Sequence, residues 1–514
     1  MNIPIPIIDI FAGPGGLGEG FSALRNDGGD PLFKIKLSIE MDEFAHRTLE
    51  LRAFFRQFIG SNRKTPVDYY EYLAGKITRT ELFSRFPQEA TLARKEAWLA
   101  ELGEVPDSEV DKKIQLALGK AATWVLIGGP PCQAYSLVGR SRMRGTDIEK
   151  FEKDPRHFLY KEYLRILAEH QPPIFVMENV KGLLSAKLNQ QKTFDLILAD
   201  LCAPLNAINK NTAFPLAYKL FSISTKRKED SLETQPRDFI VHSEDYGIPQ
   251  SRHRLIIIGI RDDIYTSTPK ILDKKEPVFI NNVLDDLPRL RSGLSKKTDS
   301  SHEWYKVVTS IKNAEWLSSV ESKLQAKIIE NAKNIEYNLS RGEAFIQTIA
   351  NPGQHREWYI DDALKGVCNH ETRGHICDDL HRYFFAAVFA LVHKRSPTLI
   401  DFPTGLLPNH NNVKNALDGS NFNDRFRVQV FGKPSTTVVS HISKDGHYYI
   451  HYDPTQCRSL TVREAARLQT FPDNYFFEGN RTQQYHQVGN AVPPLLAYQI
   501  AERVHEVLIN IQQE

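Results

Sequence analysis

A single cysteine follows a rigid Gly/Pro turn in the segment GGPPCQ, residues 128–133. The apolar run 124–127 before the turn predicts a buried strand, and the two prolines restrict the backbone between that strand and the thiol of Cys132. A strand that delivers a thiol to the crevice above a parallel sheet aims a nucleophile. The alternative is a structural cysteine, because a free cysteine often packs as a small apolar side chain.

A second candidate site lies near the start of the chain, where the apolar run 6–10 opens into FAGPGGLGEGF, residues 11–21. This pattern predicts a strand, a glycine turn and a helix, in which the glycines admit a ligand and the helix start offers free N–H groups. A strand expected over 34–39 ends in Glu40, which is placed to accept hydrogen bonds from ribose hydroxyls. The segment therefore predicts an adenosine-containing cofactor, although Pro14 disfavours the dinucleotide fingerprint.

Both segments resemble motifs of the cytosine-C5 DNA methyltransferase family, through DIFAG at 9–13 and GPPCQ at 129–133. Four later segments resemble further motifs of that family in the same order: ENV at 178–180, QSRHR at 250–254, LTVREAARLQTFP at 460–472 and QVGNAVPP at 487–494. The resemblance implies an enzyme that transfers a methyl group from S-adenosyl-L-methionine to carbon 5 of cytosine in DNA.

The resemblance implies catalytic roles for Cys132, Glu178, Arg252 and Arg254. A thiolate that adds to carbon 6 of cytosine makes carbon 5 nucleophilic, and a carboxylic acid at N3 withdraws charge from the ring. The two arginines alternate ahead of a strand, so both side chains are expected to serve one site and to favour the thiolate. A strand-end acid that caps a turn and two surface arginines are the structural alternatives.

The resemblance also implies cofactor contacts in the glycine turn, after the second strand, in the nucleophile turn and in the closing motif: Phe11, Ala12, Gly13, Gly15, Gly16, Leu17, Glu40, Met41, Pro130, Asn490 and Ala491. Asp68 and Asp111 are further candidates for the adenine contact.

A cytosine inside a duplex must be flipped out before it can react, which calls for a mobile clamp. Segment 134–156 carries glycines and arginines suited to that task, with a solvated charged loop as the alternative. The expected DNA contacts are Gln133, Ser136, Arg140, Arg142, Arg144, Arg373 and Thr437, and further candidates are Arg425, Arg427 and the segment 435–444.

Composition bounds the class of protein. The chain has 514 residues, of which 41% are hydrophobic and 25% are charged, and it contains no apolar run long enough to span a membrane. Its start lacks the features of a signal peptide, and its five cysteines are scattered, so we expect a cytoplasmic protein with reduced thiols. A net charge of +2 permits a nucleic-acid partner without requiring one.

The expected fold is α/β, with a Rossmann-like, mostly parallel sheet and helices on both faces. We expect a catalytic domain over 1–262 with a helical insertion at about 44–122, an irregular target-recognition domain over 263–482, and a return to the catalytic domain over 483–514. Duplex DNA is the expected partner of a monomer, and a restriction endonuclease is the companion that this class suggests.

Cys368, His370, His375 and Cys377 are spaced too tightly for the usual zinc pairs, so no metal is expected. Three other functions stay open. These are an RNA cytosine methyltransferase, a catalytically silent DNA-binding module and a cysteine hydrolase. The long insertion before Leu460 favours duplex DNA, the complete catalytic set opposes a silent module, and no histidine signature near Cys132 supports a hydrolase.

Overall fold

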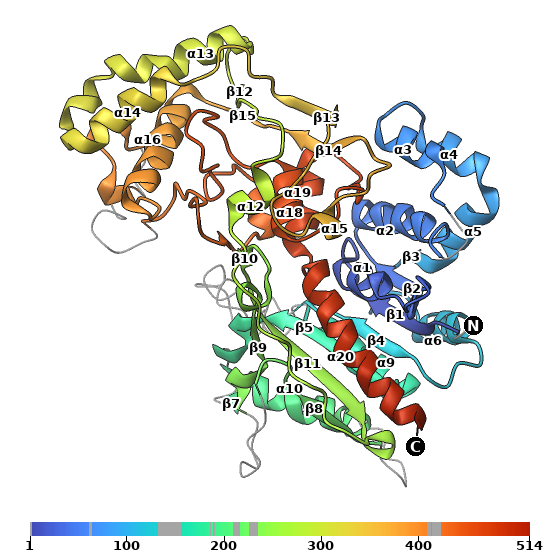
Figure 1. Cartoon of the computed structure of the whole chain (residues 1–514). Helices are drawn as coiled ribbons and strands as arrows, with labels where there is room; N and C mark the ends of the chain where they lie inside the picture. The colour runs from blue at the N-terminus through green and yellow to red at the C-terminus, as the bar shows by residue number, and fades with distance from the viewer. Residues whose placement is uncertain are drawn as a thin grey trace.

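The computed structural model describes residues 3–60, 64–131, 156–185, 187–188, 191–208, 216–225, 235–408, 413 and 423–513. Figure 1 shows a lower body built around a twisted sheet and an upper body of helices and short strands. No helix within these ranges is both long and apolar enough to cross a lipid bilayer.

The central sheet confirms the expected α/β fold. Its strands run in the order β3-β2-β1-β4-β5-β11-β8, with β9 paired to β11. The first five strands in this order are parallel to one another. Strand β11 is antiparallel to β5, β8 and β9. The bounds are β1 (Ile5–Ile10), β2 (Phe33–Glu40), β3 (Ala97–Leu99), β4 (Val125–Gly128), β5 (Ile174–Val180), β8 (Tyr218–Phe221), β9 (Ile240–His242) and β11 (His253–Arg261).

The strand order reverses beside β1. The chain passes from β1 through β2 to β3 on one side, and then returns to place β4 and β5 on the other side. In open α/β sheets, ligands bind at such a switch point, beyond the carboxyl ends of the strands. The glycine turn after β1 and the Gly/Pro turn after β4 both lie there.

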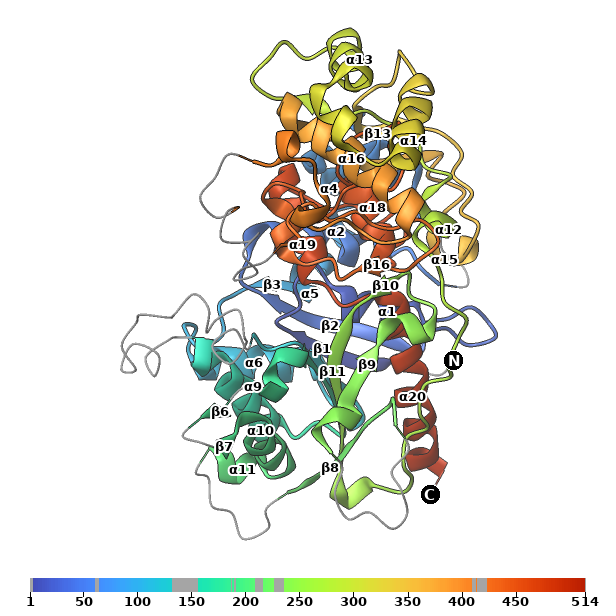
Figure 2. The same ribbon diagram turned by 90° about the vertical axis from the view of Figure 1, so that its left-hand side faces the viewer.

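Helices cover both faces of this sheet because alternate strand residues point to opposite sides. Ile7 packs in a core with α1 and α20, whereas Ile8 packs in a second core with α6, α9 and α10. Figure 2 shows α20 on one side of the sheet and α6, α9 and α10 on the other. The bounds are α1 (Gly16–Ala23), α6 (Asp107–Leu118), α9 (Arg156–His170), α10 (Thr193–Cys202), α11 (Pro204–Ala207) and α20 (Pro494–Gln513).

The segment expected as a helical insertion contains helices and one strand of the sheet. Its helices pack in a core in which Phe54 stacks on Phe83 and to which Leu364 and Cys368 of the upper body also belong. Strand β3 forms the edge of the sheet beside β2. Three residues are too few for their periodicity to reveal a strand. The bounds are α2 (Glu43–Arg56), α3 (Val67–Leu73), α4 (Arg79–Arg85) and α5 (Pro87–Glu96).

The upper body has two apolar cores. One lies among α13, α14 and α16, and the other joins α12, α18 and α19. The domain bounds drawn from the sequence stay a prediction. The helices are α12 (Ile280–Leu284), α13 (Ser301–Thr309), α14 (Ser322–Lys333), α15 (Arg356–Tyr359), α16 (Cys377–His393), α18 (Val462–Leu468) and α19 (Arg481–Asn490). The short strands are β6 (Lys187–Leu188), β7 (Gln191–Lys192), β10 (Gln250–Ser251), β12 (Gly293–Leu294), β13 (Gly342–Gln347), β14 (Gly366–Glu371), β15 (Gly374–His375) and β16 (Ser435–Thr436).

The last helix returns to the sheet body and packs closely on the first. A Cβ atom added at Gly20 in α1 would lie 2.4 Å from the carbonyl oxygen of Pro494 and 2.5 Å from the Cβ of Ala497. Both contacts belong to the start of α20, so the two helices meet at a position where only glycine fits.

We expect Gly20→Ala to destabilise the protein, although alanine favours a helix more than glycine does. The added methyl group overpacks a contact with backbone, which costs about 1–3 kcal/mol. Urea unfolding measures the loss as a lower transition midpoint. Gly28→Ala is the matched control, because Gly28 is exposed and its nearest neighbour is a flexible side-chain oxygen of Asn26 at 3.3 Å. Equal midpoints for both variants would contradict the close packing of α1 on α20.

Candidate active site

The ends of three neighbouring strands bring the candidate residues together. Ile10 of β1 lies beside Gly128 of β4, and Gly128 lies beside Met177 of β5. The next residues of these strands enter the glycine turn, the Gly/Pro turn and the position of Glu178. Three segments that are far apart in the sequence therefore meet at one edge of the sheet.

The glycine turn is held open by backbone geometry and by one carboxylate. Phe11, Gly13 and Gly15 have φ angles of 55°, 58° and 90°, in the left-handed region that favours glycine. The Gly13 N–H donates to Glu40 Oε2 at 2.7 Å, and the Asp42 N–H donates to Glu40 Oε1 at 2.8 Å. Burial raises the pKa of Glu40, and these N–H donors oppose that shift. Each oxygen keeps a second lone pair for a ribose hydroxyl.

The same turn leaves space for a ligand on one side and packs tightly on the other. A Cβ at Gly13 would meet no described atom within 4 Å, whereas a Cβ at Gly16 would lie 2.1 Å from the Val492 carbonyl oxygen. Met41 is 54% exposed, Asn490 is exposed and Ala491 is buried. An open glycine turn, a helix start and an adjoining carboxylate fit an adenosine cofactor.

Glu178 lies over the turn that leads to the candidate nucleophile. A Cβ at Gly129 would lie 3.1 Å from Glu178 Oε2. Arg254 Nε lies 3.0 Å from Glu178 Oε1, and both side chains are 12% exposed. Burial lowers the pKa of Arg254, and the Glu178 carboxylate opposes that shift. The pair places a fixed carboxyl group at the mouth of the Gly/Pro turn.

The neighbouring residue Asn179 fixes the turn itself. Its side-chain amide donates to the Pro130 carbonyl at 3.0 Å, and its amide oxygen accepts from the Val180 N–H at 2.8 Å. The sequence analysis placed Asn179 in a motif without giving it a role. Its part in positioning depends on a contact across two strands, which spacing alone does not reveal.

Six of the predicted site residues lie outside the described residues: Cys132, Gln133, Ser136, Arg140, Arg142 and Arg144. The described chain reaches Pro131, one residue before the candidate nucleophile.

Arg252 and Arg254 have different direct partners. Its guanidinium donates to the carbonyl oxygens of Val438 at 2.8 Å and Gly489 at 3.4 Å, and the residue is 2% exposed. Burial and the nearby charge of Arg254 lower the pKa of Arg252. The expected alternation fails because Arg252 lies in the irregular step between β10 and β11. Arg252 therefore contacts backbone carbonyls where Arg254 contacts Glu178, and the catalytic role expected for Arg252 stays a prediction.

Two buried glutamines continue this connection between the sheet body and the upper body. Gln250 accepts from the Val438 N–H at 2.7 Å and donates to the Leu468 carbonyl and to Gln469 Oε1, both at 3.0 Å. Gln469 in turn donates to the carbonyl oxygens of Val488 at 2.8 Å and Ala491 at 3.2 Å. We call Gln250, Arg252 and Gln469 the buried polar seam.

Two predicted DNA contacts are engaged within the protein. Arg373 is 9% exposed, donates to the Ile442 carbonyl at 2.7 Å, and lies over the Tyr485 ring at 4.5 Å. The Thr437 hydroxyl donates to the Ser251 carbonyl at 2.6 Å. Both side chains are thus held by contacts within the protein, and their predicted DNA contacts stay predictions.

The remaining candidates also have partners. Arg427 pairs with Asp424, and the Arg425 guanidinium lies 6.0 Å from the centre of the Phe426 ring. Asp68 pairs with Arg85, and Asp111 pairs with Arg165 and His170.

Three of the four residues of the Cys/His group are buried, whereas Cys377 is partly exposed. Cys368 is fully buried, and burial raises the pKa of its thiol to about 12. His370 contacts the Thr461 hydroxyl at 2.8 Å and the Pro288 carbonyl at 2.9 Å, and His375 contacts the Ser459 hydroxyl at 3.2 Å. These contacts give both histidines ordinary hydrogen-bonding roles.

Comparison with known proteins finds one family along most of the chain. The family model described as C-5 cytosine-specific DNA methylase matches residues 96–203 and 237–506. The Type II methyltransferase M.Bpa9945I of Bacillus paralicheniformis is 33% identical over 98% of this chain and 99% of its own length.

Two further relatives are more distant. The DNA (cytosine-5-)-methyltransferase M.ApeKI of Aeropyrum pernix is 29% identical over 80% of this chain and 87% of its own length. The Type II methyltransferase M.AgeI of Thalassovita gelatinovora is 27% identical over 76% of this chain and 86% of its own length.

Asp9, at the end of β1 before the glycine turn, is a buried carboxyl group. It is 1% exposed, and neither carboxylate oxygen has a hydrogen-bond partner among the described residues. Burial raises the pKa of Asp9 to about 8, Glu40 and Glu96 add to the shift, and Arg56 opposes it. Folding therefore favours the protonated form of this side chain.

Because the pKa of Asp9 is raised on folding, its stabilising contribution is complete below the unfolded pKa and is lost as the pH rises toward about 8. Between about pH 4 and that value, ionisation in the unfolded state lowers the free energy of unfolding by up to about 1.4 kcal/mol per pH unit. Asp9→Asn keeps the shape and should remove this slope, as urea unfolding across the pH range measures. Equal slopes in the two proteins would contradict a protonated Asp9.

Proposed function

The chain belongs to the C-5 cytosine-specific DNA methylase family, and on that premise we propose that it methylates a cytosine flipped out of a specific duplex DNA sequence, with Cys132 as the covalent nucleophile. The observation that carries the proposal is Glu178, which is paired with Arg254 and lies over the turn that leads to Cys132. The cofactor turn lies beside it at the same edge of the sheet.

S-adenosyl-L-methionine supplies the electrophilic methyl group in this family. Glu40 would accept hydrogen bonds from its ribose hydroxyls, since each carboxylate oxygen keeps a lone pair beyond its backbone N–H partner. The open side of the glycine turn would admit the rest of the molecule, and Phe11, Gly13, Pro130 and Asn490 would contribute contacts to it.

The reaction begins with the Cys132 sulfur. Its thiolate forms a bond to carbon 6 of cytosine, and the ring electrons shift to carbon 5, which becomes the nucleophile that takes up the methyl group. Loss of the proton from carbon 5 then returns an electron pair to the ring, and the bond between carbon 6 and sulfur breaks. This last step restores both the aromatic base and the thiolate.

Glu178 serves the first step by interacting with the base. A carboxylic acid that donates to N3 withdraws electron density from the ring and makes carbon 6 easier to attack. Arg254 holds the carboxyl group in place at 3.0 Å. Arg252 acts at one remove as a positioning residue, since its contacts to Val438 and Gly489 anchor the start of β11.

Base flipping requires the protein to close over DNA. We assign that task to segment 134–156, whose arginines would contact phosphates, and we assign sequence recognition to the upper body. Two of the relatives above are named type II methyltransferases. We therefore propose that this chain marks DNA that a companion restriction endonuclease would otherwise cut.

Cys132→Ala should abolish the covalent complex with DNA that carries 5-fluorocytosine. Fluorine at carbon 5 cannot leave as a proton does, so the enzyme stays bonded to carbon 6 after methyl transfer. A band that resists denaturation on a gel, with labelled S-adenosyl-L-methionine present, measures the complex.

Cys202→Ala is the matched control, because Cys202 is a half-buried thiol in α10 whose pKa is raised by burial. The control should form the complex as the wild type does. Methylation at carbon 5 by Cys132→Ala would contradict the mechanism.

Glu178→Gln should slow methyl transfer while leaving cofactor binding nearly unchanged. Loss of a general acid typically costs on the order of 10²–10⁴-fold in rate. Single-turnover transfer to DNA measures the rate, and equilibrium titration measures cofactor affinity. Glu303→Gln, on the surface helix α13, should match the wild type in both, whereas an unchanged rate for Glu178→Gln would remove Glu178 from this role.

A further inference from the structure

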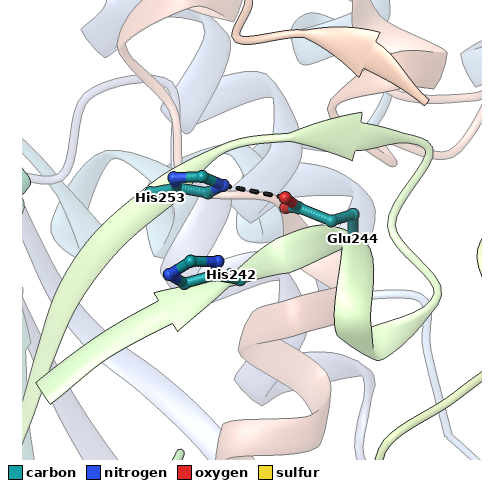
Figure 3. Close-up of side chains that lie close together, drawn as sticks. All are labelled: His242, Glu244 and His253. Atoms are coloured by element: carbon teal, nitrogen blue, oxygen red, sulfur yellow. Dashed lines mark hydrogen bonds and ion pairs between the residues drawn. The ribbon is translucent and has the colours of Figure 1, made fainter. Parts of the chain in front are cut away.

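Two histidines and a glutamate gather where β9 meets β11. His242 ends β9, His253 begins β11, and the two residues are directly paired across the antiparallel strands. Glu244 lies in η3 (Ser243–Tyr246), the helical turn that follows β9. Figure 3 shows the three side chains on one side of this hairpin, and their candidate ligand atoms all lie within 4.8 Å of one another.

We propose that His242, Glu244 and His253 form a binding site for a divalent cation of the zinc class. His253 adjoins Arg254 in β11, but no step of the methyl transfer requires the ion.

The donor set is the first argument for the site. Two imidazole nitrogens and one carboxylate oxygen are ligands that zinc binds in proteins, with a water molecule in the fourth position. His253 Nε2 lies 2.8 Å from Glu244 Oε1, so these two ligand atoms already converge. His242 is exposed, so an ion and the water molecule that serves as the fourth ligand can enter from solvent beside it.

An unpartnered oxygen is the second argument. Glu244 Oε2 is buried and has no hydrogen-bond partner among the described side chains and backbone. A buried carboxylate oxygen without a partner carries a desolvation penalty. The contact with His253 gives a hydrogen-bond partner to Oε1 alone. A cation between Glu244 and the histidines would balance the negative charge that both oxygens share.

One movement is needed for the site to close. The two imidazole rings are stacked, with centroids 4.0 Å apart and an angle of 19° between their planes. A metal lies in the plane of each imidazole that binds it, so two stacked rings cannot share one ion. The exposed His242 ring must turn about its side-chain bonds, and the proton shared by His253 and Glu244 leaves for solvent.

The position of the site gives it a structural consequence. His253 lies between Arg252 and Arg254, so a bound ion would link β9 to the start of the strand that carries Arg254. The sequence analysis expected no metal. The spacing of His242, Glu244 and His253 matches no common zinc motif, and only the pairing of β9 with β11 brings the first and last ligands together.

Zinc binding to the untagged full-length chain tests the proposal. Cys132→Ala serves as the background, because it removes the proposed reactive thiol as a competing ligand. After chelator treatment and dialysis, calorimetric titration with zinc should give one site per chain, and cobalt should give visible absorption bands. Loss of a residue that only hydrogen-bonds to a metal ligand costs about 10–100-fold in metal affinity. Because His242 and Glu244 would be ligands themselves, His242→Ala and Glu244→Gln should each weaken zinc binding at least about tenfold.

His302→Ala is the matched control, since His302 is an exposed histidine on α13. It should bind zinc as the background protein does. Thermal unfolding without metal checks that each variant is folded, and zinc should raise the unfolding temperature of the background and of His302→Ala alone. Two results would overturn the proposal. One is that the background protein binds no zinc, and the other is that His242→Ala and Glu244→Gln bind zinc as tightly as the background protein does.

Discussion

The active site depends on a buried polar seam, in which Gln250, Arg252 and Gln469 hold the sheet body against the upper body. The side chains of Gln250 and Arg252 bond to backbone groups that lie 186 to 237 residues away along the chain. Buried polar groups are costly when they lack partners, so each of these contacts fixes one arrangement of the two bodies. The strand that carries Arg254 begins at this seam, and Arg254 pairs with Glu178 of the neighbouring strand β5.

Burial also affects the charged groups at the site. Arg252 and Arg254 lie close together, burial lowers the pKa of each, and Glu178 is the carboxylate that pairs with Arg254. A buried pair of this kind adds little net stability, because desolvation offsets much of the attraction. Its value lies in a carboxyl group that is already oriented before the base arrives, which spares the reaction the cost of reorganisation.

The sequence predicted the parts of this protein that depend on local pattern. The apolar runs at 6–10, 34–39 and 124–127 correspond to β1, β2 and β4. The motifs also pointed to Glu178, which lies near the end of β5, and to Glu40, which ends β2. Their proposed roles await the experiments on this chain.

Contacts across the fold were beyond the reach of the sequence. The divergence of Arg252 from Arg254 arises from one irregular residue between two strands, and the burial of Arg373 arises from its packing on Tyr485. The role of Asn179 toward Pro130 and the meeting of His242 with His253 both depend on strand pairing. In each case the residue type was visible, but its partner was set by tertiary structure.

The packing of α20 on α1 ties the beginning of the chain to its end. Leu17 and Phe21 share one core with Leu496 and Ile500, so the core around the first helix stays incomplete until the last helix arrives. At about 5–20 residues per second, a ribosome takes on the order of half a minute to a minute and a half to make the intervening chain. Throughout that interval the nascent protein presents an apolar surface, which makes it a natural client for chaperones during its synthesis.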